Sequence, residues 1–395
     1  MTGFSAVSDG PVPTDQYAPD FRVEVEGREL DSETKGDILD LKVTMDMDAM
    51  TSVDLTFSNW DDRKLFFKYS DTTKLNVGNR VHVLMGYSGK LVSMMRGQIN
   101  SLTPRFPQSG SPTITVSVLD GMQLLKERRP AEGEETKYTQ KADWQIAEAI
   151  ATRNGMTAEV TREGPVHDEV VQKNQDDAQF LMERAKRIDF DCYVHTNPKT
   201  EQSVLRFVKP TDTRAGARVR SHAFRWYPTL MGRDPVPALL SFEPTLTLSK
   251  QVSQVTVRGW DPAAKQAIVA TATADDLPGS GEGTSGPREA QRSLGNRQDV
   301  VVDAVVTSED EARELAISLL RERAYEFITG SGQIIGLPEL RPGDNMDLDG
   351  LGQRFSGSYY VKKVEHTIGS SGFGTRFEVR RVFDGGTQSG GGTTA

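Results

Sequence analysis

The feature that most constrains the fold is a strict alternation of apolar and polar residues in short runs. The runs lie at 21–25, 39–47, 53–57, 81–85 and 114–118. Each run places its apolar side chains on one face, as a half-buried antiparallel strand requires. Turn signals such as NVGNR and GYSGK separate the runs. The pattern predicts a small β-barrel or sandwich over roughly residues 21–120.

Helical periodicity begins only after Asp120. Segments 143–153 and 175–188 each carry an apolar stripe, and the charged residues of the second segment, Arg184 among them, are expected to face water. Ser308 and Glu311 have the spacing of a capping box and predict a third helix to about residue 325. Strand-like runs at 189–195 and 204–208 make this middle stretch α/β or α+β.

The C-terminal part returns to β patterning and resembles the first barrel. The segments VGNRVHV, MRGQINSLTP and TITVSVLD are matched, in the same order, by PGDNMDL, FSGSYYVKKVEH and TRFEVRRVFD. We align Gly78 with Gly343, Gly97 with Gly357, and Asp120 with Asp384. This spacing predicts two copies of one small barrel, with α/β material inserted between and within them. Chance similarity of β-hairpins is the alternative.

The expected fold class is therefore α+β and mainly β, with two related small antiparallel β-barrels and an inserted α/β domain. Residues 273–299, rich in Gly, Ser and Pro, are expected to form a long mobile loop in that domain. The expected units are a flexible arm at 1–20, a first barrel at 21–125, the middle domain at 126–235 plus 263–325, a second barrel at 236–262 plus 326–384, and a flexible tail at 385–395.

Composition narrows the class of protein further. The single cysteine, Cys192, excludes an internal disulfide framework and a multi-cysteine zinc site. No run approaches the roughly 18 apolar residues of a membrane helix, and the N-terminus has no secretory signal, so neither membrane insertion nor classical secretion is expected. The net charge is −9, and residues 1–62 hold 15 acidic and only 4 basic residues. An acidic chain of this kind is not expected to bind nucleic acid.

No catalytic or metal-binding motif stands out, so we assign no catalytic, cofactor or metal residues. His82 and His366 fall on predicted strands and are expected to pack there. Cys192 is expected to be a small buried side chain. The run DNMDLDG at 344–350 imitates the start of a calcium loop, but its twelfth position is Ser356, which cannot supply two oxygens. We interpret it as a turn leading into a strand.

Three segments resemble one known family in order and spacing. QKNQDDAQFLMERAKRIDFDCYVH (172–195) is similar to the segment that precedes the central sheet in phage late control D proteins and in the hub region of VgrG spike proteins. VRGWDPAAKQ (257–266) and the C-terminal block from Gly336 to Thr375 are similar to the same family. In the first segment the matching residues are Gln172, Asp177, Phe180, Leu181, Arg184 and Ala185.

The resemblance implies a structural baseplate hub protein of a phage tail or contractile injection system, not an enzyme. It implies tail-tube-like barrels, a homotrimer, and a role as adaptor between a hexameric inner tube and a trimeric spike carried on a separate chain. Other baseplate proteins would be further partners, and no cofactor is implied. Assembly is expected in the bacterial cytoplasm, and release in an extracellular particle is left open, as is phage against injection system.

Two other functions compete with this interpretation. A tail-associated cell-wall hydrolase would need an acid/base constellation in a cleft, which no motif supplies. A carbohydrate-binding receptor module would place aromatic residues on loop tips, and Trp60, Trp226 and Trp260 lie near loops.

Overall fold

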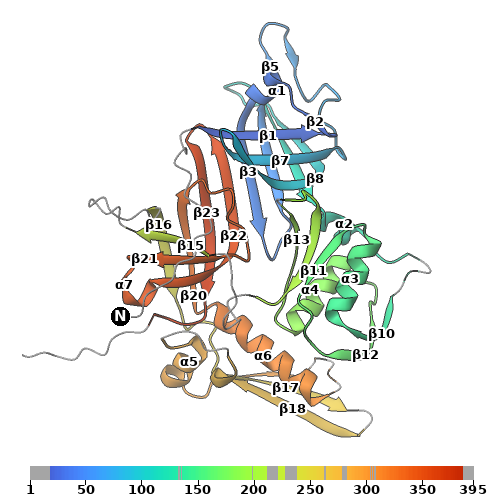
Figure 1. Ribbon diagram of the computed structural model, residues 1–395, viewed down its shortest axis with the longest axis vertical. Coiled ribbons are helices and arrows are strands. Elements are labelled where there is room, and N and C mark those ends of the chain that lie inside the picture. The colour runs from blue at the N-terminus through green and yellow to red at the C-terminus, as the bar shows by residue number, and fades with distance from the viewer. Residues whose placement is uncertain are drawn as a thin grey trace, which may run out of the picture.

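The computed structural model describes residues 18–385. The excepted positions are 132–133, 135, 198, 211–220, 227–237, 262–263, 278–282, 303, 305 and 307. Nearly all of the expected arm and tail fall outside this range. Four packed units are visible in Figure 1: the first barrel at the top, the second barrel below it, an α/β unit beside it, and a helix-covered sheet at the bottom. Among the described residues, no helix is both long and apolar enough to cross a membrane.

The first barrel is formed where the sequence alternation predicts it. Its strands lie in the order β1-β7-β8-β9-β4-β3, each antiparallel to the next. Their apolar faces enclose one core, which includes Val43, Leu55 and Val116. The strands are β1 (Pro19–Val25), β3 (Ile38–Asp46), β4 (Ser52–Ser58), β7 (Arg80–Tyr87), β8 (Lys90–Arg105) and β9 (Thr113–Asp120), with β2 (Arg28–Glu29), α1 (Ser32–Gly36), β5 (Trp60–Asp61) and β6 (Phe66–Phe67) between them.

The second barrel repeats this arrangement and closes on itself. Its six strands lie in the order β15-β21-β22-β23-β20-β16, and a short β15–β16 ladder completes the ring. Strand β15 departs from the antiparallel expectation, because it runs parallel to both β16 and β21. The strands are β15 (Ser221–Trp226), β16 (Ala238–Leu246), β20 (Ile328–Ile335), β21 (Asn345–Asp349), β22 (Gly357–Gly369) and β23 (Gly372–Arg381), with α7 (Gly352–Phe355) before β22.

The two barrels correspond strand by strand, in chain order and in space. A register shift after Ile99 in the β8–β9 ladder recurs after Val361 in β22–β23. A second shift, after Ile38 in β3–β4, recurs after Leu239 in β16–β20. The internal repeat is therefore confirmed, and α/β material does lie between and within its copies.

The repeat corrects part of the sequence alignment. Gly78 and Gly343 are equivalent: the amide of Gly78 donates to the carbonyl of Ile99 at 2.8 Å, and that of Gly343 donates to the carbonyl of Val361 at 2.9 Å. Aligning the bulges, however, moves Gly97 off Gly357 and Asp120 off Asp384 by two or three residues. The alignment failed there because loop lengths differ between the copies, and sequence spacing cannot reveal a bulge.

The middle stretch holds two separate cores instead of the single expected domain. The first core belongs to an α/β unit that follows the first barrel. The predicted helices α3 and α4 are present there, and α4 buries Phe180 and Leu181 as its apolar stripe predicts. The unit contains α2 (Met122–Glu127), β10 (Lys137–Ala142), α3 (Asp143–Arg153), β11 (Thr157–Val160), β12 (Val166–Val171), α4 (Asp177–Arg187), β13 (Asp191–Thr196) and β14 (Ser203–Val208).

The second core lies between a three-stranded sheet and helix α6, inserted between β16 and β20. Strand β17, which we expected in the second barrel, pairs here with β18 and β19. The expected mobile loop at 273–299 is wrong for Gly286–Leu294, which form helix α5, capped by Ser285. The elements are β17 (Gln254–Asp261), β18 (Gln266–Thr273), η2 (Ala274–Asp276), α5 (Gly286–Leu294), β19 (Gln298–Val301) and α6 (Glu309–Tyr325), whose predicted Ser308 cap is present.

The equivalent glycines Gly78 and Gly343 give a matched test of how the second barrel docks on the α/β unit. Both have positive φ, at +88° and +90°. A methyl group on Gly78 would meet no atom within 4 Å, whereas one on Gly343 would lie 2.8 Å from the hydroxyl of buried Tyr193. We expect Gly78→Ala to cost about 1–2 kcal/mol through backbone strain. Gly343→Ala should cost about 1 kcal/mol more, because the Tyr193 hydroxyl must move from its hydrogen bonds. Urea unfolding of both variants measures the difference, and equal losses would contradict the docking role.

Asp120 should make stability depend on pH. Its carboxylate lies buried at the end of β9 and accepts hydrogen bonds from the amides of Thr51 (3.2 Å) and Met122 (3.0 Å). Burial outweighs these bonds and raises the pKa of Asp120 to about 7. The folded state therefore binds more protons than the unfolded state between about pH 4 and 7. The free energy of unfolding consequently falls as the pH rises through that window.

The Asp120→Asn variant should lack this pH dependence. The stability of the wild type relative to the variant should fall by up to about 1.4 kcal/mol per pH unit over the window. Urea unfolding at pH 5 and pH 8 checks this, with Asp62→Asn at an exposed position as the control. Parallel pH profiles for the wild type and Asp120→Asn would contradict the assignment.

Candidate functional site: a polar sheet face shared by both barrels

Strand β3 of the first barrel pairs with β22 of the second, so one sheet runs through both. The ladder joins Leu41–Asp46 to Lys363–Ile368. Alternate residues of these strands point into the two cores, and the others form a single outward face. We call this the shared sheet face. On it lie Asp40, Lys42, Thr44, Asp46, Asp54, Thr56, Thr115, Ser117, Ser241, Glu243, Ser331, Gln333, Lys363, Glu365, Arg376 and Glu378.

The charges on this face are loosely paired across neighbouring strands. Lys363 lies between Asp46 and Glu378, with nitrogen–oxygen distances of 3.8 and 3.4 Å. Glu365 lies between Lys42 (3.7 Å) and Arg376 (3.9 Å). Long, partly exposed pairs of this kind contribute about 0–1 kcal/mol each to stability. The face is therefore better described as a solvated surface than as a brace for the fold.

Carboxylates outnumber basic side chains on the shared sheet face. Burial raises the pKa of the Asp40 carboxyl, Lys42 partly opposes the shift, and the nearby carboxylates of Glu365 and Asp54 raise it further. Asp40, Lys42, Thr44 and Asp46, the polar residues of the alternating run 39–47, all lie here and are half-buried. Over the second barrel the face is hollowed by about 420 Å³.

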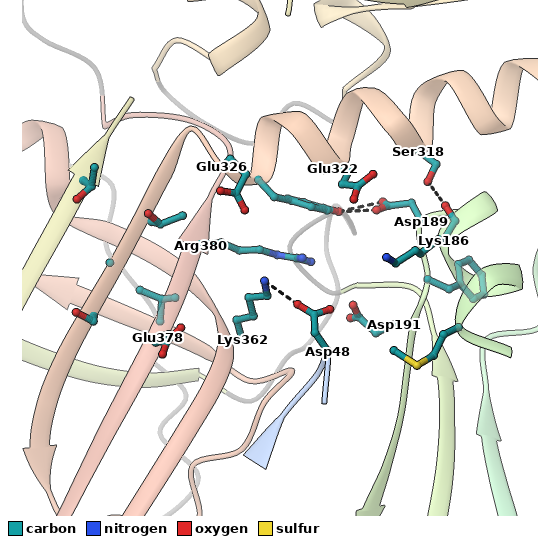
Figure 2. A pocket seen from close by; sticks show the side chains of 18 of the residues that line it. Asp48, Lys186, Asp189, Asp191, Ser318, Glu322, Glu326, Lys362, Glu378 and Arg380 are labelled. Carbon is teal, nitrogen blue, oxygen red and sulfur yellow. Dashed lines mark hydrogen bonds and ion pairs between the residues drawn. The ribbon is translucent and has the colours of Figure 1, made fainter. Parts of the chain in front are cut away.

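A larger cleft, of about 820 Å³, adjoins this hollow. Figure 2 shows its two walls, with Lys362 and Arg380 extending from the second barrel toward the α/β unit. Lys362 binds Asp48 at 2.7 Å; burial alone would lower the pKa of Lys362, but this hydrogen bond shifts it upward overall. The guanidinium of Arg380 lies 3.5 Å from the ring centroid of Tyr325.

Asp189 lies in the cleft wall formed by the α/β unit and connects that wall to helix α6. It accepts hydrogen bonds from the hydroxyl of Tyr325 at 2.9 and 3.0 Å and pairs with Arg321 at 3.0 Å, both on α6. Ser318, also on α6, donates to the backbone carbonyl of Lys186 at 2.5 Å. These contacts tie α6 to α4 and β13. The chemistry of the cleft is that of a joint between units, because its polar groups are used in contacts between neighbouring elements.

The cysteine, the two histidines and the acidic run that we considered as candidate site residues all make structural contacts. Burial raises the pKa of Cys192 to about 12 and lowers that of His366 to about 3. His82 is buried beside Ser93, at 2.8 Å. In the run 344–350, Asp347 accepts from Ser221 and Asp349 pairs with Arg225, so both carboxylates bind strand β15. Among the described residues, no group of three or more His, Cys, Asp or Glu could hold a metal ion.

One buried ionic cluster was missed from the sequence. Arg184, expected to face water, is half-buried and binds the buried carboxylate of Asp143 at 2.6 Å, with His167 at 3.1 Å from the same carboxylate. Asp143 itself is the first residue of α3 and not its cap. Helical periodicity placed Arg184 on the polar side of α4, and only tertiary packing covers that side with α3 and β12. The three tryptophans near loops lie on separate units, on β5, β15 and β17.

The fold is shared with tail proteins of known structure. A 43 kDa tail protein of prophage MuSo2 from Shewanella oneidensis superimposes with a TM-score of 0.65 at 13% identity, covering 92% of this chain and 98% of that one. A tail protein from Neisseria meningitidis gives 0.66 at 12% identity, with coverage of 93% and 98%. An Escherichia coli type VI secretion component gives 0.54 at 13% identity, covering 90% of this chain and 76% of that chain.

Sequence comparison adds the family. A search of the curated proteins gives no match. The model of the Alg8 N-terminal domain, in contrast, matches residues 16–204 and 237–370, which is most of the chain. The protein therefore belongs to the Alg8 N-terminal domain family.

Proposed function

We propose that this chain is a structural baseplate hub protein of a phage tail or contractile injection system. In this proposal three copies form an adaptor between a hexameric inner tube and a trimeric spike on a separate chain. The observation that carries the proposal is the pair of barrels with one strand order, joined in a single sheet by the β3–β22 ladder. Three chains would present six similar barrels around one axis, which resolves the mismatch between sixfold and threefold partners.

The likeness to tail proteins and a type VI secretion component supports this role. The specific assignment to the late control D proteins is part of the proposal. So are the inner tube, spike and other baseplate proteins as partners, and assembly in the bacterial cytoplasm before incorporation into the particle. A hydrolase is less well supported, because the polar groups of the large cleft serve as joints between units. A carbohydrate-binding module is less well supported, because the tryptophans do not gather.

We expect three copies of the chain in the assembled hub, because two barrels per chain then match a sixfold tube. A cryo-EM reconstruction of the baseplate counts them directly. The isolated chain in dilute solution serves as the reference for what assembly adds, and it can be monomeric without conflict. Six copies or one copy at the hub would contradict the proposal.

We further propose that part of the shared sheet face lines the axial channel. An acidic lumen would repel acidic cargo and nucleic acid and so reduce adhesion during passage. Replacing Asp40 and Asp46 by Lys should make the channel surface less negative, and cryo-EM of the assembled hub should show both positions at the lumen. Asp62→Lys, at an exposed turn position that is not part of this face, should leave the channel unchanged. Finding residues 40 and 46 on the outer wall would overturn the lumen assignment.

A further inference from the structure

The β3–β22 ladder uses one strand edge from each barrel and leaves the repeat-related edges unpaired. By the strand correspondence, β16 is the counterpart of β3, and β8 is the counterpart of β22. Beyond Leu239, β16 pairs only with β20. Beyond Ile99, β8 pairs only with β9. Among the described residues, nothing pairs with the free edge of either segment.

The recurring bulges fix how one junction maps onto the other. Leu39 and Leu240 occupy equivalent bulges and are 50% and 52% exposed. Asn100 and Lys362 occupy the other equivalent pair. With these positions aligned, the intrachain pairs can be transferred residue by residue. Thr44–Glu365 becomes Thr245–Thr103, and Lys42–Thr367 becomes Glu243–Arg105.

We propose that the distal half of β8 in one copy pairs antiparallel with β16 of the next copy, in this register. The inference rests on the proposed trimer and names the surface that builds it. Glu243 and Arg105, both exposed, would face each other across the new junction with opposite charges. On the core-facing side, Leu102 would meet Leu246. Phe106, which is 61% exposed in the single chain, would meet Phe242.

The side chains at the intrachain junction show what this contact would achieve. Leu41 is fully buried there, opposite the partly buried Ile368. In the transferred register, Phe242 and Phe106 take these two places. A second copy would thus cover an aromatic side chain that the single chain leaves largely in water, and removing apolar surface from water favours association.

Prolines on both edges limit the number of backbone hydrogen bonds that the junction can form. Pro104 and Pro244 meet in this register, so neither edge offers an amide hydrogen at that pair. Proline on an edge strand also hinders pairing with an arbitrary strand. The intermolecular junction would therefore have fewer backbone hydrogen bonds than the intrachain one and depend more on its side chains. That suits a contact that forms only on assembly.

Repeating the same junction geometry between chains would close three copies into a ring. The first barrel joins the second within a chain, and the second would join the first of the next chain by an equivalent contact. If each junction turns the sheet by about one sixth of a circle, three chains close a ring. Such an interface is head-to-tail, so each copy uses its β8 edge and its β16 edge once.

The test is a disulfide across the junction in the assembled hub. The double variant Thr103→Cys and Thr245→Cys places two thiols directly opposite each other, on the same face of the sheet. The native Cys192 is buried and does not compete. Mild oxidation should give covalently linked chains up to a trimer and no larger species on non-reducing electrophoresis. The control, Thr103→Cys with Leu246→Cys, is slipped by one residue, which puts the thiols on opposite faces, so it should not cross-link.

The outcomes separate this inference from the proposed function. A hub with three copies in which only the 103–245 pair cross-links supports the register. A hub with three copies in which that pair fails to cross-link, or in which only the slipped pair does, overturns the register and leaves the hub role standing. A copy number other than three overturns the proposed function.

A charge exchange tests the same pair without a covalent bond. Arg105→Glu and Glu243→Arg should each weaken trimer association several-fold, as like charges would then face each other. The double exchange should restore most of the loss. Restoration is a readout that simple misfolding of either single variant would not give, and additive losses in the double variant would contradict the pairing.

Discussion

The architecture depends on the antiparallel ladder between β3 and β22. Each strand belongs to a different barrel, and the ladder joins two separate hydrophobic cores through one continuous sheet. In each of these strands alternate side chains point into a barrel core, and the side chains between them point to the opposite face of the sheet, where neither core can bury them. The shared polar face is the direct consequence. The same ladder fixes the barrels relative to each other, because a one-residue slip would turn the apolar face of one barrel to the polar side of the shared sheet.

The inserted units are attached to this frame by polar contacts. Asp189 ties α6 to the loop before β13, and Tyr193 reaches the turn at Pro342, where Gly343 leaves room for its hydroxyl. Hydrogen bonds of this type fix how the units are oriented but add little net stability, because each buried polar group gives up its hydrogen bonds to water. Gly343 is required both by its positive φ and by the lack of space for a Cβ beside Tyr193. At its counterpart Gly78 only the positive φ favours glycine.

The comparison between the two barrels shows how a duplicated element diverges. Strand order, two bulges and one glycine turn are retained, although the sequence identity of the copies is low enough that two of three aligned positions were misplaced. The first strand differs most, since β1 is antiparallel to β7 while β15 is parallel to β21. The second barrel closes through β15, whereas β1 pairs, among the described strands, with β7 and the short β2 alone.

The sequence by itself determined the elements whose signal is local. Period-two alternation located the barrel strands, the apolar stripes located α3 and α4, and the Ser308 cap located the start of α6. Local periodicity cannot say which strand edge meets which, so the sequence did not place β17 in its separate sheet. Nor could it show that α5 interrupts the expected loop, or that Arg184 turns inward to pair with buried Asp143. Only the tertiary structure decided the β3–β22 pairing and hence the shared sheet face, because register between strands about 320 residues apart depends on packing the two cores together.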